Sequence, residues 1–564
     1  MKFNEFKYER LDFDKSTKEF SNLLDKLEKS TDSKEFKKIF KELNVFRAHL
    51  TTMVSLAQVR HTIDTSDKFY DEENDYWNDK LPLYASYENK LSKIALKCDF
   101  KDELYDYIPE TYFKLAECSE KSFDEKIIPL LQEENRLTTE YGKLKASAKI
   151  EFEGEILNLS QIAAKALDDN REKRKKAYDA KIDFYSKNEA EFDRIFDELV
   201  KVRDKMAKSL GFKNYIELGY LRMNRLDYDQ DMVANYRKQI VNDIVPTVTK
   251  LREKQANRLG LKSLKYYDIP YKFATGNPKP KGSANDLVNA AVEMYHDMSP
   301  ETSEFIDLMY NSELWDLKSK PNKEMGGYCT TFPDYKAPFI FSNFNGTSGD
   351  VDVLTHEAGH AFQAYQSRNI ETIDCQGPTL ESCEIHSMSM EFFAYKYMNK
   401  FFKEDTQKYY YLHLAGTLEF LPYGVLVDHF QHVIYENPNM SIDDRKKAYH
   451  DLESIYLPNN DYGDNQLLNK GCWWYQQGHI FQVPFYYIDY TLAQVCALQF
   501  WVRMINDDKT YWNDYLHLCK LGGTKSFLQL VQEANLISPF EDGCLKTVKD
   551  KANEYFNSVD DTKL

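Results

Sequence analysis

Proline is scarce in the first third of this chain, where apolar residues recur at helical spacing. Three of the 17 prolines fall within residues 1–195. Within residues 16–30, for example, apolar residues recur three and four positions apart. A second, long helix is expected over about 160–187. Because proline breaks helices and this spacing lines one helix face, the sequence predicts an almost entirely helical N-terminal lobe.

Two segments interrupt the helical pattern with strand-like alternation. Residues 149–159 predict a small hairpin, and residues 328–332 and 339–344 predict an antiparallel pair. The proline- and glycine-rich residues 266–283 predict a loop. The expected fold is therefore mainly α with a small antiparallel β-sheet, divided into an N-terminal lobe (1–195) and a C-terminal region (196–564).

Charge and cysteine usage exclude several classes of protein. The net charge is −17, and the 74 Lys and Arg are interspersed with 91 Asp and Glu, so we expect no nucleic-acid partner. Nine cysteines without a Cys-x-x-Cys motif favour a reducing, cytoplasmic location. The N-terminus has no signal-peptide pattern. Phe485–Val502, the most apolar stretch, is expected to be a buried helix and not a membrane span.

Residues 356–360 read His-Glu-Ala-Gly-His, the motif with the clearest chemical meaning. On a helix, His356 and His360 lie one turn apart on the same face, so both imidazoles can bind one zinc ion. Glu357 lies beside the first ligand and can act as general base toward a zinc-bound water. Ser348 or Asp350 can cap the start of this helix. We therefore expect one Zn²⁺ per chain.

A catalytic zinc needs a third protein ligand and an open position for water. The helix expected after Pro378 offers four candidates, Glu381, Glu384, His386 and Glu391. Spacing alone does not choose among them. Glu384 and Glu391 lie two turns apart on one face, so one can bind zinc while the other supports a ligand.

These segments resemble the thimet oligopeptidase and oligoendopeptidase F family of zinc peptidases, and look closest to its bacterial Pz-peptidase branch. The resemblance is carried by the lead-in 338–355, the motif 356–360, the helix 381–393 and the aromatic run 479–494. It covers about residues 325–500. It implies an elongated, mostly helical ellipsoid with a deep substrate channel, a small sheet beside the zinc helix, and zinc on the channel floor.

The resemblance also implies roles for individual residues. It makes Glu384 the third zinc ligand. It further implies that a histidine and two tyrosines late in the chain face the reacting carbonyl. The matching candidates are His479, Tyr486, Tyr487 and Tyr490. We favour Tyr486 and Tyr490 over Tyr487, because positions four apart share a helix face.

The favoured function is a zinc-dependent endopeptidase that cleaves short, unstructured oligopeptides. A zinc carboxypeptidase or dipeptidyl carboxypeptidase is the nearest alternative, and it would need a cation such as Arg368 or Arg503 for the substrate carboxylate. A peptide-binding protein with a non-catalytic zinc is the remaining alternative. The intact Glu357 argues against it, because a structural zinc site needs no base.

Two further segments are open to more than one interpretation. The hairpin edge at 337–345 can pair with an extended peptide, or it is an ordinary sheet edge. Residues 469–479 contain two glycines around Trp473 and Trp474. They predict either a flexible active-site loop or a buried aromatic turn.

Overall fold

The chain forms two units, each assembled from three separate stretches of sequence. The computed structural model describes residues 1–81 and 83–564. Unit 1 comprises Met1–Lys121, Lys279–Thr406 and Cys496–Ser538, and unit 2 comprises Ser122–Pro278, Gln407–Val495 and Pro539–Leu564. Both are mainly helical, which confirms the expected fold class. The lobe boundary near residue 195, the elongated outline and the channel stay predictions.

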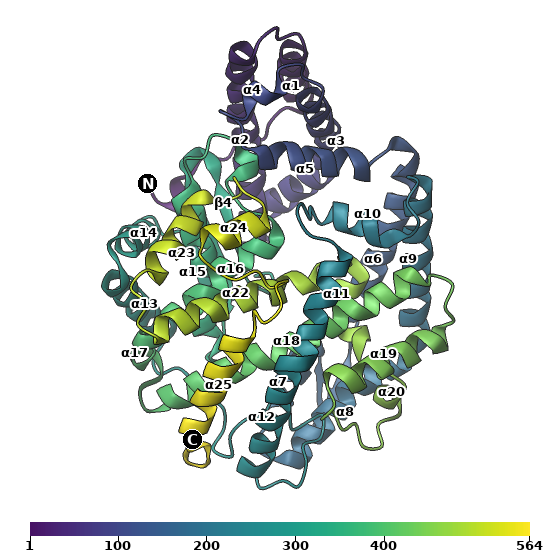
Figure 1. Ribbon diagram of the computed structural model, residues 1–564, viewed down its shortest axis with the longest axis vertical. Coiled ribbons are helices and arrows are strands. Elements are labelled where there is room, and N and C mark those ends of the chain that lie inside the picture. Colours follow the sequence, from purple (N-terminus) through teal and green to yellow (C-terminus); the bar gives the residue numbers. More distant parts are fainter. The chain divides into compact units, whose positions relative to one another are not determined.

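Unit 1 combines helices from all three of its stretches with a small sheet (Figure 1). Helix starts follow local capping: Asp12 accepts a hydrogen bond from the Lys15 N–H at 2.8 Å, so α1 begins at Phe13. Its elements are α1 (Phe13–Glu28), α2 (Ser33–Ile63), α3 (Lys68–Leu96), α4 (Lys101–Leu104), α5 (Glu110–Ser122), α13 (Ala284–Met298), α14 (Pro300–Asn311), β3 (Trp315–Lys318), β4 (Tyr328–Phe332), β5 (Ala337–Phe344), α15 (Gly349–Ser367), α16 (Leu380–Phe393), α17 (Asn399–Phe402), α23 (Tyr511–Leu521) and α24 (Phe527–Glu533).

The sheet of unit 1 has the strand order β3-β5-β4. Strands β4 and β5 pair antiparallel, with Tyr328 opposite Phe341, which confirms the expected pair. Strand β3 pairs parallel with β5, so the sheet is mixed and not purely antiparallel. The interpretation of 337–345 as a sheet edge is wrong, because β5 is the central strand; the outer strand on this side is β4.

Unit 2 is built mainly from helices and carries a separate two-stranded hairpin. Its elements are α6 (Ile128–Ala146), β1 (Ile150–Phe152), β2 (Glu155–Leu157), α7 (Leu159–Lys165), α8 (Arg171–Lys187), α9 (Glu189–Ser209), α10 (Tyr215–Arg222), α11 (Gln230–Gln239), α12 (Val245–Arg258), α18 (Thr406–Glu436), α19 (Ile442–Tyr456), α20 (Gln466–Asn469), α21 (Gly478–Gln482) and α25 (Lys546–Ser558). Helix α22 (Tyr487–Ile505) starts in unit 2 and ends in unit 1.

The hairpin expected at 149–159 is confirmed, because β1 and β2 pair antiparallel across Glu153 and Gly154. These two residues have φ of 50° and 86°, as a tight two-residue turn requires. The single helix expected over 160–187 is wrong. Its residues form α7 and α8, because the Asn170 side chain accepts hydrogen bonds from two N–H groups that follow it and starts a new helix.

Residues 469–479 form a buried aromatic turn, the second of the two interpretations. Trp474 is 1% exposed and Tyr475 is fully buried. The Trp474 ring lies 4.6 Å from the Phe196 ring and 5.2 Å from the Phe430 ring, measured between centroids. The Tyr475 hydroxyl donates a hydrogen bond to Asp193 at 2.6 Å. Helices α9 and α18 thus fix this turn in the core of unit 2.

The apolar stretch 485–502 falls mostly in α22, as the sequence predicts. Among the described residues, no helix is both long enough and apolar enough to cross a membrane.

Candidate metal centre and active site

Helices α15 and α16 of unit 1 carry the predicted metal ligands, and their backbones approach each other closely at Gly359. A Cβ atom at Gly359 would lie 2.6 Å from the Ser387 Cα and 2.8 Å from the His386 carbonyl oxygen. Only glycine allows this approach, because any Cβ atom would clash with the backbone of α16. The approach places the side chains of α15 and α16 against each other.

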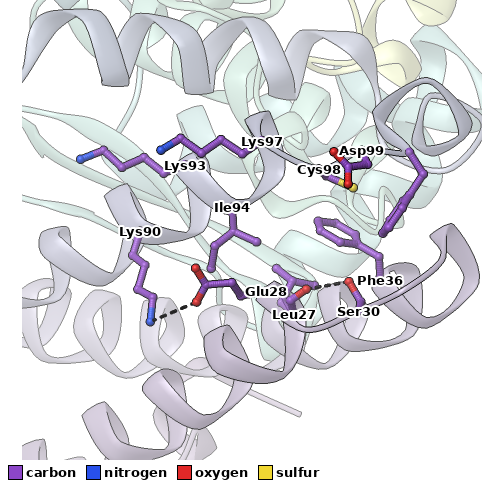
Figure 2. Close-up of a pocket in the computed structure, with 11 residues that line it drawn as sticks. Leu27, Glu28, Ser30, Phe36, Lys90, Lys93, Ile94, Lys97, Cys98 and Asp99 are labelled. Atoms are coloured by element: carbon purple, nitrogen blue, oxygen red, sulfur yellow. Dashed lines mark hydrogen bonds and ion pairs between the residues drawn. The ribbon is translucent and has the colours of Figure 1, made fainter.

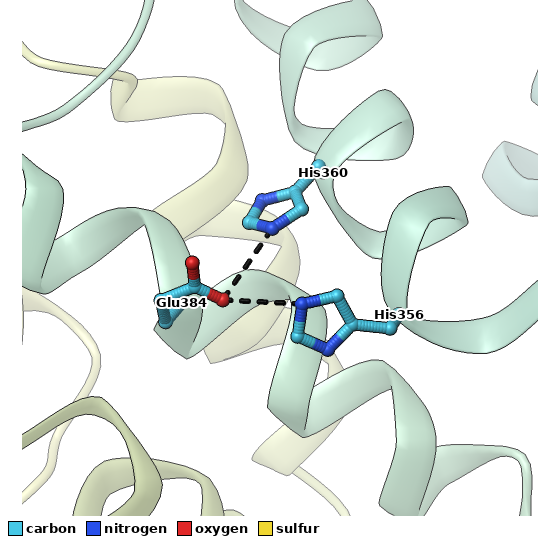
Figure 3. Close-up of side chains that lie close together, drawn as sticks. All are labelled: His356, His360 and Glu384. Atoms are coloured by element: carbon cyan, nitrogen blue, oxygen red, sulfur yellow. Dashed lines mark ion pairs between the residues drawn. The ribbon is translucent and has the colours of Figure 1, made fainter. Parts of the chain in front are cut away.

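Three ligand atoms converge across this contact (Figure 3). The Nε2 atoms of His356 and His360 lie 3.2 Å and 3.4 Å from the same Glu384 oxygen, Oε2. The three ligand atoms all lie within 4.8 Å of one another. Two imidazole nitrogens and one carboxylate oxygen are a donor set that suits zinc. The residues present therefore fit the expected metal.

Two neighbours hold these ligands in orientation. The Nδ1 atom of His356 lies 2.6 Å from Glu391 Oε1, so it donates there and leaves Nε2 to face the metal position. The Ser387 hydroxyl donates to Glu384 Oε2 at 2.9 Å. This arrangement is the one that their spacing allows, with Glu384 placed as a candidate ligand and Glu391 placed to support His356.

The charges of the ligands stabilise one another. Burial lowers the pKa of His356, but hydrogen bonds to Glu384 and Glu391 outweigh it and hold that pKa well above its usual value. Burial raises the pKa of Glu384, but its contacts with His356 and His360 outweigh it and lower that pKa. The carboxylate is therefore ionised, the state in which it binds a metal.

The other two candidate ligands lie outside this group of three. Glu381 is fully buried and accepts a hydrogen bond from the Thr379 hydroxyl at 2.9 Å. His386 is also fully buried, and its Nδ1 lies 3.3 Å from the Cys383 carbonyl oxygen. Burial lowers the pKa of His386 to about 4, so it is a neutral core histidine.

Glu357 lies on α15 between the two histidines and is partly exposed. Its charge is one of the influences that raise the pKa of Cys329, after burial. Cys329 belongs to β4, a strand against which α15 packs. The sequence gives no signal for this contact, because it depends on how the sheet packs against α15.

In unit 2, the structure brings the predicted histidine and tyrosines together. The His479 ring centroid lies 5.6 Å from that of Tyr486, 4.9 Å from Tyr487 and 5.8 Å from Tyr490. Tyr486 and Tyr490 are 4.9 Å apart. The Gln477 amide meets His479 Nδ1 at 2.7 Å. All three tyrosines surround the histidine, and their roles at a reacting carbonyl stay a prediction.

A left-handed residue precedes these tyrosines. The Tyr486 N–H donates to the Val483 carbonyl oxygen at 3.2 Å, and Phe485 between them has φ of 68°. Glycine is the usual residue at such a turn position. The Phe485 N–H donates to Gln431 Oε1 at 2.9 Å, and its carbonyl oxygen accepts from Arg225. The sequence analysis did not single out Gln431 and Arg225, which hold this turn. The local signal for the turn itself was Pro484, which directly precedes Phe485.

The two arginines proposed for a substrate carboxylate are engaged elsewhere. Arg503 pairs with Asp508 at 2.6 Å and also with Asp514. The Arg368 guanidinium lies 3.5 Å from the centre of the Tyr365 ring and donates to the Tyr365 carbonyl oxygen. Neither arrangement supports the alternative of a terminal carboxylate site at these positions.

A separate pocket of about 330 Å³ lies between α1 and α3 in unit 1 (Figure 2). Lys90 faces Glu28 across it at 4.0 Å, and it also pairs with Asp25 at 2.8 Å. None of the predicted site residues is among the described residues that line this pocket. Its lining residues are Leu27, Glu28, Ser30, Phe36, Lys90, Lys93, Ile94, Lys97, Cys98, Asp99 and Phe100.

Comparison with solved structures finds similar proteins that match this chain over its whole length. A structure of Pz peptidase A with an inhibitor is 49% identical, with a TM-score of 0.93 and 100% of both chains covered. A Bacillus anthracis protein assigned as an oligoendopeptidase F is 47% identical, with a TM-score of 0.89, over 100% of this chain and 99% of that one.

A curated relative matches over a shorter stretch. Oligoendopeptidase F of Lactococcus lactis subsp. cremoris is 23% identical over 200 residues, which is 36% of this chain. The match spans 32% of that relative's length. Two family models match as well: the Peptidase M3 N-terminal domain over residues 3–123 and Peptidase family M3 over residues 165–550. The chain therefore belongs to peptidase family M3.

Proposed function

We propose that this chain is a zinc-dependent endopeptidase that hydrolyses internal peptide bonds of short, unstructured oligopeptides. One observation carries the proposal: His356, His360 and Glu384 place three ligand atoms within 4.8 Å of one another. Glu357 lies on α15 together with the two histidines. Three protein ligands are the usual set of a catalytic zinc, whereas structural zinc sites are closed by four. Membership of peptidase family M3 supports the same chemistry.

His356, His360 and Glu384 would hold the metal. When bound, zinc acts as a Lewis acid that polarises the scissile carbonyl and lowers the pKa of water toward about 7. Glu357 takes a proton from the attacking water on its carboxylate and delivers it to the leaving nitrogen. Glu391 keeps His356 in the tautomer that presents Nε2.

We assign the oxyanion-stabilising role to His479, Tyr486 and Tyr490. The rings of Tyr486 and Tyr490 lie close to the His479 ring and to each other, which supports treating the three residues as a group. Loss of one such donor typically lowers the rate by about 10²–10³. Tyr487 lies as close to His479 and is the alternative to either tyrosine.

An extended peptide can add to the sheet at its outer strand β4. Its partner β5 already has neighbours on both sides. Helix α15, which carries Glu357, packs against β4, so a peptide along this strand would lie beside the helix of the proposed base. Backbone pairing of this kind binds without demanding particular side chains.

The test is hydrolysis of an internally quenched peptide blocked at both ends. We expect the zinc-loaded protein to cleave it, chelation to abolish cleavage, and added zinc to restore it. The Glu357→Gln variant should bind zinc and lose activity, because the amide accepts no proton from water. Cleavage that survives chelation, or survives in Glu357→Gln, would contradict the mechanism. Cleavage limited to peptides with a free C-terminus would favour the carboxypeptidase alternative.

A further inference from the structure

Two lysines of unit 2 meet at one glutamine. Lys145 lies near the end of α6 and Lys181 lies on α8. The Lys145 Nζ donates to the Gln476 carbonyl oxygen at 3.0 Å, and the Lys181 Nζ donates to Gln476 Oε1 at 3.1 Å. Three separate elements thus bring two ammonium groups to the same residue of the aromatic turn.

No carboxylate among the described residues pairs with either of these ammonium groups. Burial lowers the pKa of Lys145, and burial together with Lys145 lowers the pKa of Lys181 to about 8. Both side chains nevertheless keep part of their surface exposed. Two positive charges in a partly desolvated position repel each other, and a bound anion would offset this repulsion.

Other enclosed lysines of unit 2 do have acidic partners. Lys446 pairs with Glu189 and Asp193, both at 2.6 Å. Lys272 pairs with Glu419 at 2.7 Å. The missing counter-charge is therefore a property of the Lys145–Lys181 position and not of buried lysines in this unit.

The lysine pair is close to the predicted reactive group of unit 2. The Lys145 charge, after burial, lowers the pKa of His479. Gln477, which follows the bridging glutamine, contacts His479 at 2.7 Å. The Lys181 Nζ also lies 5.7 Å from the centre of the Trp473 ring. An anion bound by the pair would therefore lie beside the residues assigned to the reaction.

We propose that Lys145 and Lys181 form a subsite that binds a carboxylate of the peptide substrate, at its C-terminus or on an acidic side chain. The inference rests on the proposed function and adds a preference among substrates. Each ammonium has three donors, so donors remain after the bond to Gln476. The two oxygens of one carboxylate can accept from both lysines, and charge-assisted hydrogen bonds of this kind are the strong ones.

The experiment uses four internally quenched peptides of one sequence. They carry a free acid or an amide at the C-terminus, combined with Glu or Gln at one internal position. Each is assayed with the zinc-loaded protein and with the Lys145→Met/Lys181→Met double variant. Control variants are Lys143→Met and Lys176→Met, which remove exposed lysines from the same two helices.

We expect kcat/KM to be about 10-fold or more higher for the peptides that bear the recognised carboxylate, mainly through a lower KM. The double variant should lose this preference, so that its kcat/KM becomes equal for the peptides with and without the carboxylate. A higher kcat/KM for the free acid than for the amide identifies the C-terminal carboxylate as the bound group. A higher kcat/KM for the Glu peptide than for the Gln peptide identifies an acidic side chain. Lys143→Met and Lys176→Met should retain the preference.

Equal kcat/KM for all four peptides, or a preference that persists in the double variant, would overturn the subsite. Failure of the zinc-loaded protein to cleave any of them would instead overturn the proposed function. In that case, calorimetric binding of the same peptides to Glu357→Gln protein, with and without the two lysines, decides the subsite alone. Tighter binding of carboxylate peptides only when both lysines are present supports it, and equal binding refutes it.

Discussion

Gly359 shows how one missing side chain sets the geometry of the three candidate metal ligands. Its Cα lies where the backbone of α16 leaves no room for a Cβ, with the Ser387 Cα 2.6 Å from that position. Backbone atoms do not rotate away as the end of a side chain can. Any residue larger than glycine therefore separates α15 from α16 and moves His356 and His360 relative to Glu384.

The Gly359→Ala variant should thus lose both stability and zinc affinity. Overpacking of this kind costs about 1–3 kcal/mol, although alanine favours the helix itself. Urea unfolding and zinc titration against a competing chelator measure the two effects. Gly416→Ala is the control, because a Cβ there meets nothing within 4 Å on helix α18. Unchanged zinc affinity in Gly359→Ala would show that the helix contact does not set the site.

At the scale of elements, the turn before α22 determines where the tyrosine cluster begins. Phe485 adopts a conformation that costs a non-glycine residue about 1–3 kcal/mol. Its ring occupies the space that Gly219 leaves, since a Cβ at Gly219 would lie 2.6 Å from the Phe485 Cδ2. Arg225 and Gln431 hold the backbone on either side of the same residue.

The Gln431→Leu variant should loosen this turn. The buried Phe485 N–H would lose its acceptor, which costs about 1–3 kcal/mol of unfolding free energy. If the turn positions Tyr486 and Tyr490, kcat should fall while KM for a neutral peptide changes little. Urea unfolding and steady-state kinetics separate the two effects. A loss of stability with unchanged kcat would assign the turn a purely structural role.

Elements with a local signal were predictable from sequence, and elements that depend on distant partners were not. Helix α15 and the β4–β5 pair follow from spacing and turn residues. Strand β3 was missed because it pairs in parallel with a strand that follows it by more than 20 residues. Ser348, one of the two expected caps of α15, is its N-cap residue, although its side chain makes no capping hydrogen bond. Asp350, the other candidate, accepts hydrogen bonds from the N–H groups of Asn345 and Gly346.

The candidate site divides in the same way. The motif at 356–360 and its helical period placed His356 and His360 together without any structure. Spacing left four candidates for the third ligand, and the fold brings Glu384 to the histidines. Lys145 and Lys181 carry no sequence signal, because only the packing of α6, α8 and the aromatic turn makes them neighbours.

At the scale of the whole molecule, an acidic group in unit 2 couples stability to pH. Burial raises the pKa of Glu453 to about 8, and the Tyr462 hydroxyl donates a hydrogen bond to its Oε1. His450 Nδ1 lies 3.7 Å from the other carboxyl oxygen. A glutamate in the unfolded chain titrates near 4.3. Glu453 therefore favours the folded state fully below that pKa, and this contribution is lost as the pH rises toward 8.

The unfolding free energy of the protein should consequently fall between about pH 5 and pH 8 relative to Glu453→Gln, which stays neutral. The difference is on the order of a few kcal/mol. Urea unfolding of both proteins at several pH values within this range measures it, and other titrating groups cancel in the comparison. Parallel pH profiles for the two proteins would show that Glu453 does not titrate in this way.

The interleaving of the two units has a consequence for how the protein is made. Unit 1 needs residues up to Ser538, and unit 2 needs residues up to Leu564. Unit 1 therefore stays incomplete on the ribosome until Ser538 has emerged, and unit 2 until Leu564 has emerged. Contacts between distant stretches form slowly, because long loops must close first. We therefore expect the last stretch of each unit to be needed before that unit can fold, and the earlier stretches to need protection from aggregation until then.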